Sequence, residues 1–264
     1  MQISIYQGPE KSLSVDDHLN LMAQQSQAAS TAGSDLLIFP EMFLTGYNIG
    51  AKRTRELAQP GHGPALQRAA HIAATFNIAV LFGFPELDDN KVYNSAILID
   101  NTGQQKSLYR KSHLFGDIDR SAFSAGNSQS EIVELNGVKM GILICYDVEF
   151  AENVRHLALA GADFIAVPTA LMVPYEFVPT KLVPARAFEN QLFLAYANRC
   201  DTEQELKYYG LSCICAPDGS DLARAGEKEA LITARLDFEQ QSVSRQLNTH
   251  IGDRRPELYK KLVE

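Results

Sequence analysis

The sequence predicts an α/β domain built on a mixed sheet or on a pair of sheets. Short apolar, β-rich runs alternate with helical patterns along all 264 residues, without a low-complexity segment or a Ser/Gly linker. A helix-to-strand unit occurs twice, as AGSDLLIFPE at 32–41 and as AGADFIAVPT at 160–169. The Asn136-Gly137 pair predicts a β-hairpin. With 45% hydrophobic and 21% charged residues, the composition is that of a globular protein, and we expect one domain.

The first half of the chain alternates strands with helices. A strand is expected in MQISIYQ at the N-terminus, followed by a helix over 16–32 that has Leu19, Met22 and Ala23 on one face and Asp16 near its start. The next expected elements are a strand in DLLIFP (35–40), a helix over 65–77, and two strands, 78–86 and 92–100, separated by the turn-like LDDNK.

The second half follows the same logic. The hairpin is expected within 130–145, followed by a helix over 152–162, a strand over 163–170 and a helix over 180–191. Three further strands are expected within 192–199, 209–217 and 227–237, and the last of them should close the sheet.

The repeated unit has a physical explanation in each half. Ala-Gly ends a helix, four apolar residues form a buried strand, and proline stops sheet pairing at the strand end. The repeat indicates either two related halves or a connection that any α/β protein reuses. In both cases Glu41 and Thr169 fall just past strand ends, where ligands bind in open α/β sheets.

Composition excludes several classes of partner and location. The formal net charge is -8 and no basic run is present, so neither nucleic acid nor an anionic membrane is an expected partner. The N-terminal residues lack the pattern of a signal peptide, and no apolar stretch approaches the length of roughly 20 residues that spans a bilayer. The four cysteines are too few and too clustered for a disulfide framework, which favours reduced thiols and a cytoplasmic location.

Neither a metal ion nor a cofactor is expected. Cys213 and Cys215 should face the same side of a strand, but the sequence shows no partner ligands at a suitable spacing. Buried packing is therefore the favoured interpretation of these two thiols.

Four polar residues near expected strand ends are candidates for chemistry: Glu41, Lys111, Asp119 and Cys145. Glu41 is either a general base with a raised pKa or a surface salt-bridge residue. Lys111 is either a catalytic cation or an exposed lysine, and Cys145 is either a nucleophile or a small buried hydrophobe. Taken singly, none of these residues decides between its two interpretations.

Together these residues lie in motifs that resemble the nitrilase superfamily of carbon–nitrogen hydrolases. The motifs are DLLIFPEMFLTGY around Glu41, LYRKSHLFG around Lys111 and GILICYDVEFAENVRHLALAGAD around Cys145. Their order and spacing, 70 residues and then 34, match the family pattern, as do VYNSAILID, PARAFENQLFLAYANR and GDRRPELY. The resemblance covers nearly the whole chain.

The resemblance implies a four-layer α-β-β-α sandwich with two pseudo-symmetric halves, formed by residues 1–264 as a single carbon–nitrogen hydrolase domain. It also implies association through a helical face into a homodimer or a larger homo-oligomer. Residues from about 245 to 264 are expected to form a tail that packs at this interface.

The resemblance further implies a Glu-Lys-Cys triad. Cys145 would be the nucleophile that forms a thioester, and Glu41 the base that takes its proton and later activates water. Lys111 would stabilise the oxyanion together with the backbone N–H of Tyr146. A second glutamate often supports this triad, and Asp119, eight residues after Lys111, is the best match for it, ahead of Asp117.

Further residues are expected to line the substrate pocket: Tyr47, Glu86, His113, Glu149, Thr169, Ala170, Met172 and Tyr175. Glu86 would bind an amino group or form a salt bridge. His113 is interpreted as an orienting residue, although a Cys–His dyad is the rival chemistry. Asp147 and Glu149 are expected to cap the helix that starts near Ala151.

These observations predict an amidohydrolase that cleaves a small-molecule carboxamide to a carboxylic acid and ammonia, a hydrolase of non-peptide carbon–nitrogen bonds. A nitrilase and an N-carbamoyl-amide hydrolase with the same triad are alternatives. An inactive binding protein is a third alternative, and the presence of all three triad residues weighs against it.

Overall fold

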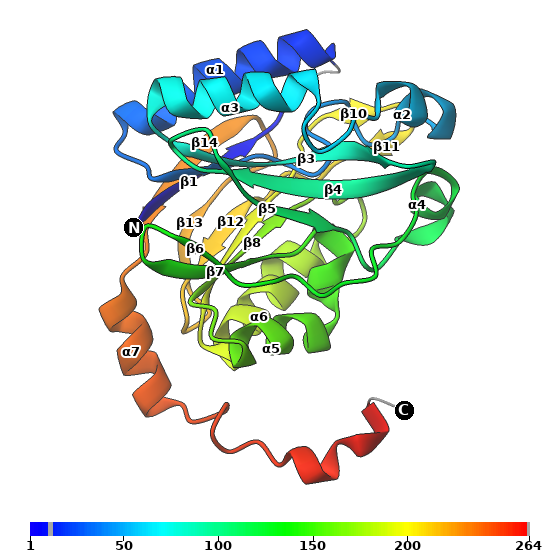
Figure 1. Ribbon diagram of the computed structural model, residues 1–264. Helices are drawn as coiled ribbons and strands as arrows, with labels where there is room; N and C mark the ends of the chain where they lie inside the picture. Colours follow the sequence, from blue (N-terminus) through cyan, green and yellow to red (C-terminus); the bar gives the residue numbers. More distant parts are fainter. Residues whose placement is uncertain (10–12, 263–264) are drawn as a thin grey trace.

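Two six-stranded sheets pack face to face between two pairs of helices in the computed structural model, which describes residues 1–9 and 13–262 (Figure 1). Helices α1 (Val15–Thr31) and α3 (Pro64–Phe76) cover the outer face of one sheet. Helices α5 (Ala151–Leu159) and α6 (Val183–Asn190) cover the outer face of the other. The predicted four-layer α-β-β-α sandwich is therefore confirmed.

The two sheets contain strands from different parts of the chain. Across the first sheet the order is β14 (Ala230–Arg235), β1 (Gln2–Gln7), β2 (Leu36–Ile38), β3 (Ala79–Asp88), β4 (Lys91–Ile99) and β5 (Gln105–Arg110). Across the second it is β13 (Asp221–Arg224), β12 (Cys213–Cys215), β9 (Phe193–Ala197), β8 (Phe164–Pro168), β7 (Val138–Ile142) and β6 (Val133–Leu135). The C-terminal strand β14 pairs with β1, so it closes the first sheet as predicted.

The two halves have the same topology. Strand β2 lies between two parallel neighbours, β1 and β3, and β8 lies in the same way between β7 and β9. All other pairs in both sheets are antiparallel. Because α1 leads into β2 as α5 leads into β8, the repeated sequence unit marks equivalent connections in two related halves.

Apolar side chains from both sheets fill the space between them, among them Ile3, Leu36, Leu81, Met140 and Phe164. A second cluster fills the space between the first sheet and its helices, with Leu19, Met22, Leu66, Ile72 and Phe82. Burial of each large apolar side chain contributes about 1.5–3 kcal/mol, so these two clusters hold the layers together.

Turn residues set the hairpins. Asn136 and Gly137 have φ angles of 52° and 78°, the left-handed conformation that a two-residue hairpin turn requires, and they join β6 to β7 as predicted. The predicted strand over 209–217 is wrong in its extent, because β12 begins only at Cys213. Gly210 and Leu211 have φ angles of 68° and 57°, which break the strand before that residue.

Several short elements have no counterpart in the sequence predictions. They are α2 (Ala51–Leu57), α4 (Gly116–Ala122), β10 (Thr202–Glu203), β11 (Leu206–Lys207), β13, and the short helices η1 (Cys145–Glu149), η3 (Pro256–Leu258) and η4 (Lys260–Leu262). Most of them are too short to carry a periodic pattern. The short helix η2 (Val178–Leu182) overlaps the start of the helix predicted over 180–191.

The C-terminal residues leave the body of the molecule. Helix α7 (Phe238–Leu247) packs at its edge, where the Gln241 side chain donates to the carbonyls of Asp163 and Gln191 at 2.9 and 3.2 Å. Beyond α7 the chain runs below α5 and α6 (Figure 1). Within the described residues, the helices are all too short or too polar to span a bilayer.

Candidate active site

The candidate site lies where equivalent strands of the two sheets end. Glu41 follows β2 and Thr169 follows β8, and the Glu41 N–H donates to the Thr169 carbonyl at 3.3 Å. Lys111 directly follows β5, and Cys145 opens η1 after β7. The fold thus brings together residues that are 104 positions apart in the sequence.

Cys145 stands on a strained turn. Its φ angle is 47°, a conformation that a residue with a Cβ atom rarely adopts, and its side chain is buried. The backbone of Ala170 forms a hydrogen bond with the thiol. The Glu41 carboxylate and the Lys111 ammonium are both near enough to the sulfur to affect its pKa, so the turn holds the thiol beside these two residues.

Lys111 is fully buried between two carboxylates. Its Nζ atom donates to Glu41 Oε1 and to Asp119 Oδ2, both at 2.7 Å. The Asn94 side chain donates to the same Glu41 oxygen at 2.6 Å. Since a buried charge is costly without a partner, the two acids keep Lys111 charged and fix its position.

Burial and neighbouring charges shift the titration of all three triad residues. Burial raises the pKa of Glu41, with a further contribution from Asp119, although Lys111 opposes this. Burial opposes charge on Lys111, but Glu41 and Asp119 outweigh it and raise its pKa well above the usual value. Burial and Glu41 raise the pKa of Cys145 well above the usual value, so its resting form is a thiol.

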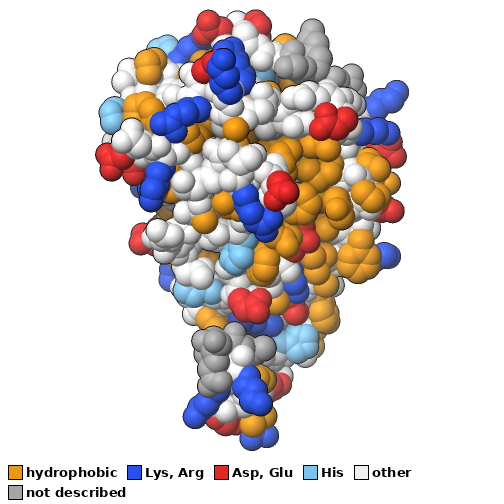
Figure 2. Space-filling model, turned by 90° about the vertical axis from the view of Figure 1, so that its right-hand side faces the viewer, with side chains coloured by type: hydrophobic (Ala, Val, Ile, Leu, Met, Phe, Trp, Pro, Cys, Tyr) orange, Lys and Arg blue, Asp and Glu red, His pale blue; other side chains and the backbone are white. Residues whose placement is uncertain are grey.

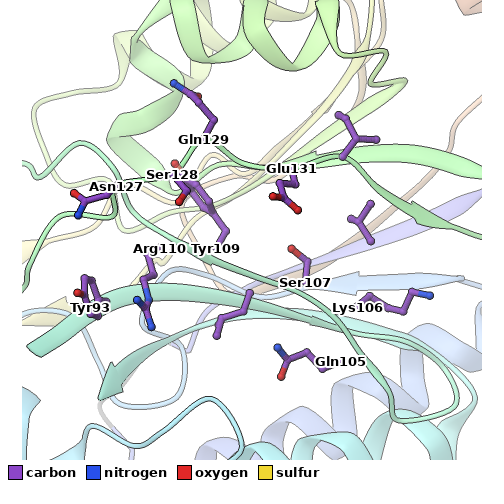
Figure 3. Close-up of a pocket in the computed structure, with 13 residues that line it drawn as sticks. Tyr93, Gln105, Lys106, Ser107, Tyr109, Arg110, Asn127, Ser128, Gln129 and Glu131 are labelled. Atoms are coloured by element: carbon purple, nitrogen blue, oxygen red, sulfur yellow. The ribbon is translucent and has the colours of Figure 1, made fainter. Parts of the chain in front are cut away.

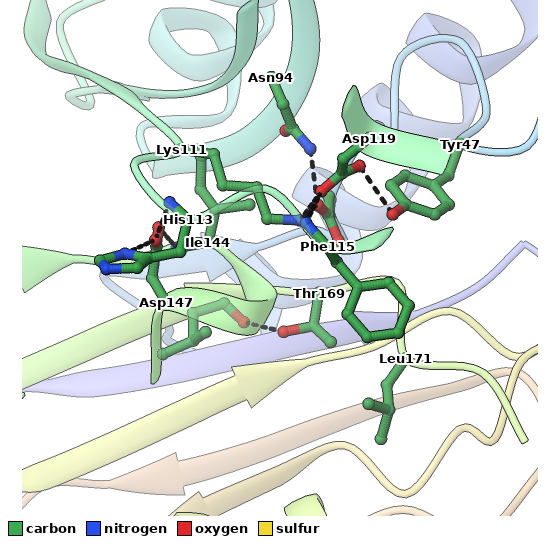
Figure 4. A network of polar contacts seen from close by, with 12 residues as sticks. Tyr47, Asn94, Lys111, His113, Phe115, Asp119, Ile144, Asp147, Thr169 and Leu171 are labelled. Atoms are coloured by element: carbon green, nitrogen blue, oxygen red, sulfur yellow. Dashed lines mark hydrogen bonds and ion pairs between the residues drawn. The ribbon is translucent and has the colours of Figure 1, made fainter. Parts of the chain in front are cut away.

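Asp119, and not Asp117, is the second acid at this centre. Asp119 is fully buried in α4, and besides Lys111 it accepts from the Tyr47 hydroxyl and the Phe115 N–H, both at 2.8 Å (Figure 4). Asp117 is exposed and lies 3.9 Å from Arg120. The structure therefore places Asp119 beside Lys111, where the resemblance implies a second acid, and brings Tyr47, expected only as a wall of the pocket, into contact with it.

Asp147 does not cap the helix that follows it, so this prediction is wrong. Helix α5 has Phe150 at its N-cap and no side-chain cap. The buried Asp147 carboxylate instead accepts from five donors, namely Ile144 N, Tyr109 Oη, Ser112 Oγ, and both the backbone N and Nδ1 of His113, at 2.9–3.2 Å. Five close donors outweigh the weak attraction of a helix terminus.

His113 is oriented by this contact. Its Nδ1 atom lies 3.0 Å from Asp147 Oδ1, and its ring stacks on Phe150 with centroids 4.0 Å apart. These contacts fit the orienting interpretation of His113, and they direct Nδ1 to Asp147. Glu149, predicted as a second cap, does not cap α5 either. It is half-buried, and its carboxylate is close enough to the thiol to raise the pKa of Cys145 slightly.

Glu86 does not lie free in a pocket. Its carboxylate accepts from Arg110 Nη2 at 2.5 Å and Nε at 2.8 Å, and from the Ser95 hydroxyl at 2.7 Å. The salt-bridge alternative is therefore the one that the structure shows, and the proposed contact of Glu86 with an amino group of the substrate is corrected. Arg110 reaches Glu86 from β5, across the intervening strand β4, and a contact between strands two positions apart in the sheet gives no signal in the sequence.

Several of the other predicted pocket residues belong to a cluster of apolar and aromatic side chains that includes Tyr47 of the centre. Met172 packs with Tyr47 and Ala170 in one cluster, and the half-exposed Tyr175 contacts the Phe115 ring with centroids 5.9 Å apart. Tyr146 contacts the same Phe115 ring at 5.3 Å. Hydrophobic side chains also form a broad patch on the face of the molecule that Figure 2 shows. The site is thus polar at its base and aromatic at its rim.

Two further features of the molecule lie outside this centre. A groove of about 590 Å³ between β5 and residues 127–133 is lined mainly by polar side chains (Figure 3). The triad residues do not line it, so it is separate from the candidate site.

The second feature combines Cys213, Cys215 and Asp221, whose donor atoms lie within 4.8 Å of one another. The sequence did not suggest Asp221 as a third donor. Arg224 already binds both oxygens of Asp221, at 2.6 and 2.7 Å, and a hydrogen bond to Cys213 together with burial raises the pKa of Cys215. A neutral Cys215 thiol, and an Asp221 carboxylate already bound by arginine, fit buried packing better than a metal site.

Comparison with known proteins places this geometry among carbon–nitrogen hydrolases. The sequence model of the carbon–nitrogen hydrolase family matches residues 2–246. The chain is 51% identical over 260 residues to a Pseudomonas protegens protein named hydrolase in pqqF 5' region, which covers 98% of this chain and 90% of the relative. It is 36% identical over 242 residues to an (R)-stereoselective amidase from a Pseudomonas species, covering 91% and 87% of the two chains.

A solved structure of a glutamate-to-glutamine mutant of the amidase from Nesterenkonia sp. AN1 superposes with a TM-score of 0.85 at 31% identity, covering 99% of this chain and 96% of that one. That structure is described as showing covalent addition of the acetamide moiety of fluoroacetamide at the active-site cysteine.

Proposed function

This chain belongs to the carbon–nitrogen hydrolase family, and we propose that Glu41, Lys111 and Cys145 carry out its reaction through a cysteine thioester. The enzyme is an amidohydrolase that cleaves carboxamides to a carboxylic acid and ammonia. The observation that supports the triad most strongly is the position of the fully buried Lys111. Its Nζ atom lies 2.7 Å from a carboxylate oxygen of Glu41 and 2.7 Å from one of Asp119, near the turn that carries Cys145.

In the first half of the proposed reaction the Cys145 sulfur attacks the amide carbonyl carbon while its proton passes to Glu41. A thiol with a raised pKa needs such a base, because little thiolate is present at rest. Lys111 has three N–H donors, and two are bound to Glu41 and Asp119. The third donor and the Tyr146 N–H would bind the oxyanion. Loss of one such donor typically costs about 10²–10³ in rate.

In the second half the tetrahedral intermediate collapses. The C–N bond breaks, and the leaving nitrogen takes the proton from Glu41, which releases ammonia and leaves a thioester on Cys145. Glu41 then takes a proton from water as the water oxygen attacks the thioester carbon. Breakage of the C–S bond returns the proton to sulfur and releases the carboxylic acid, so Glu41 is a base twice and an acid twice.

Replacement of Cys145 by Ala tests this assignment. We expect ammonia release from small aliphatic amides such as acetamide and butyramide to fall at least about 10³-fold, because the nucleophile is lost. Replacement of the buried Cys213 by Ala is the matched control and should keep activity within about threefold, since its thiol lies outside the site. Activity retained by Cys145→Ala would show that another group is the nucleophile.

The same panel should include nitriles and N-carbamoyl amino acids, which test the two alternative activities. Glu149 favours uncharged or cationic amides over substrates with a carboxylate, because its half-buried carboxylate lies near the reacting sulfur. We therefore expect uncharged carboxamides to be hydrolysed faster than N-carbamoyl amino acids.

We further propose that residues 1–264 act as one domain whose C-terminal residues, from about 245, pack at a homodimer interface. Exposed apolar side chains support this: Leu159 on α5, Phe188 on α6, and Leu258 and Tyr259 in the tail. The cytoplasmic location expected from the cysteines stays a prediction.

A further inference from the structure

We propose that Tyr47 is a positioning residue of the catalytic centre, whose hydroxyl holds the short side chain of Asp119 in reach of Lys111. This inference rests on the proposed function, because it assigns Tyr47 a role in orienting the lysine that binds the oxyanion. It goes beyond the pocket-wall role that the sequence suggested for this residue.

The contacts of Asp119 leave its carboxylate no freedom to rotate. Oδ2 accepts from Lys111 Nζ at 2.7 Å and from Phe115 N at 2.8 Å, and Oδ1 accepts from the Tyr47 hydroxyl at 2.8 Å. Figure 4 shows Lys111 and Tyr47 on opposite sides of this carboxylate. Without the Tyr47 hydroxyl, Oδ1 would have no partner among the described residues, and either oxygen could turn toward Lys111.

The position of the carboxylate between Lys111 and Tyr47 suits the short side chain of an aspartate. A glutamate at position 119 would be longer by one methylene and would place its carboxylate about 1.5 Å further from the α4 backbone. Since both contacts of Asp119 are already at hydrogen-bond distance, the added length would push the carboxylate against Lys111 or the Tyr47 hydroxyl. Tyr47 and Asp119 are therefore matched to each other.

Tyr47 is itself fixed by a buried ion pair. Its backbone N–H and that of Asn48 donate to Glu203 Oε2 at 3.0 and 2.7 Å. Glu203 lies 2.9 Å from the buried Arg199 and accepts from the Tyr208 hydroxyl at 2.6 Å. The loop after β2 thus obtains its rigidity from charge-assisted hydrogen bonds rather than from sheet pairing.

Two further observations support a fixed tyrosine. The Tyr208 ring packs against the Tyr47 ring with centroids 6.5 Å apart. Gly46 has a φ angle of 93°, and a Cβ atom there would lie 2.5 Å from Glu203 Oε1, so this close approach of loop and carboxylate requires glycine. Burial raises the pKa of Tyr47 well above its usual value, which keeps its hydroxyl a donor.

Replacement of Tyr47 by Phe removes the hydroxyl and keeps the ring. We expect kcat for acetamide to fall about 10- to 100-fold, the range for a hydrogen bond to a charged group, with KM within about threefold. The control is Tyr6→Phe, which removes a buried hydroxyl bound to Glu229 on the far side of the first sheet. It should leave kcat unchanged. An unchanged kcat in folded Tyr47→Phe would contradict the proposal.

A double-mutant cycle with Asp119→Glu separates positioning from general destabilisation. We expect Asp119→Glu alone to lower kcat at least about tenfold, because the longer carboxylate meets the Tyr47 hydroxyl. The double variant Tyr47→Phe/Asp119→Glu should be at least about tenfold more active than the product of the two single losses, because the hydroxyl no longer obstructs it. Losses that simply multiply, or full activity of Asp119→Glu, would overturn the proposal.

A measurement without turnover separates this inference from the proposed function. Iodoacetamide carries a carboxamide and alkylates a thiol, so that an S–C bond forms, iodide leaves and the thiol proton passes to base. We expect its rate of reaction at Cys145, followed by peptide mass spectrometry, to fall at least about tenfold in Tyr47→Phe and to stay unchanged in Tyr6→Phe. A wild-type protein without amidase activity would refute the proposed function, whereas equal alkylation rates would refute the role of Tyr47.

Discussion

At the scale of single residues, the two oxygens of the Glu41 carboxylate have different surroundings. Oε1 accepts from Lys111 and Asn94, at 2.7 and 2.6 Å. Oε2 is buried and has no hydrogen-bond partner among the residues that the structure describes. This difference leaves Oε2 as the atom that can take the thiol proton, while Oε1 holds the carboxylate in place.

Replacement of Asn94 by Ala should therefore shift the pH dependence of the reaction. A donor to the charged form of an acid lowers its pKa, so loss of the Asn94 donor raises the pKa of Glu41 further above its usual value. The base is active when deprotonated, and activity is lost as pH falls through this pKa. The acid limb of kcat/KM should move to higher pH by about 1–2 units, which corresponds to a hydrogen bond to a charged group.

The control for this pH profile is Asn101→Ala, which removes an exposed amide bound to Asn77 just past the end of the same strand. Its acid limb should coincide with that of the wild type. A profile of Asn94→Ala that also coincides with the wild type would mean that Glu41 is not the base seen in the acid limb.

The sequence predicted the charged residues of the centre better than their neutral partners. Glu41, Lys111 and Cys145 stand beside strand ends in recognisable motifs, Asp119 was selected by its spacing of eight residues from Lys111, and the structure brings all four together. Asn94 was missed because it lies inside a strand and meets Glu41, 53 residues away, only through the pairing of β3 with β4. A position inside a strand gives no signal that distinguishes a catalytic partner from a packing residue.

At the scale of elements, Asp147 joins the loop after β5 to the turn after β7. It accepts from the His113 backbone N–H and side chain on one side, and from the Ile144 N–H on the other. These two segments carry Lys111 and Cys145 respectively. Because β5 belongs to the first sheet and β7 to the second, this carboxylate fixes the relative position of two catalytic side chains from different sheets.

Replacement of Asp147 by Asn should disturb both the fold and the reaction. An amide NH₂ in place of one oxygen faces donors and leaves at least one of them unpaired, at a cost of about 1–3 kcal/mol. We expect Tm to fall by about 2–12 °C, since 1 kcal/mol corresponds to roughly 2–4 °C for chains near this size. We expect kcat to fall at least about tenfold, because the segments that carry Lys111 and Cys145 are then no longer held in a fixed relative position.

The control for Asp147→Asn is Asp163→Asn. Asp163 lies at the far end of the second sheet, where its carboxylate accepts from Lys139 N and Arg245 at 3.4 and 3.5 Å. This substitution should alter Tm slightly and leave kcat unchanged. A normal kcat in Asp147→Asn at a temperature well below its Tm would show that the contact is structural only.

Element prediction succeeded where one segment carries its own signal. The Asn136-Gly137 hairpin and the repeated helix-to-strand unit are confirmed, because turn conformation and strand ends depend on nearby residues. Helix α4, which holds Asp119, has seven residues and no apolar period, so its place depends on tertiary contacts such as those of Tyr47 and Lys111. The capping role expected for Asp147 was wrong for the same reason.

At the scale of the whole molecule, each related half supplies part of the reaction. Glu41 and Lys111 follow strands of the first sheet, and Cys145 follows a strand of the second. The two central parallel strands, β2 and β8, end at the same place and are joined there by the contact of Glu41 with Thr169. Neither half contains a complete triad, which supports the proposal that the chain acts as one domain.

Substitutions in the tail, the residues from about 245 onward, test the proposed dimer interface. Gln191 and Phe188 hold the start of the tail against α6, the latter through a ring contact of 5.5 Å with His250, but Leu258 and Tyr259 remain largely exposed. Burial of two such side chains against a second copy would contribute about 1.5–3 kcal/mol each. The double variant Leu258→Ser/Tyr259→Ser should therefore raise the dimer dissociation constant at least about 100-fold, measured by sedimentation or light scattering across a dilution series.

The control for this prediction is Val173→Ser, which removes an exposed hydrophobic side chain outside the tail and outside the helical face formed by α5 and α6. It should leave the dimer dissociation constant unchanged. Equal dissociation constants for the double variant and the wild type would place the interface elsewhere and leave the tail without a role in assembly.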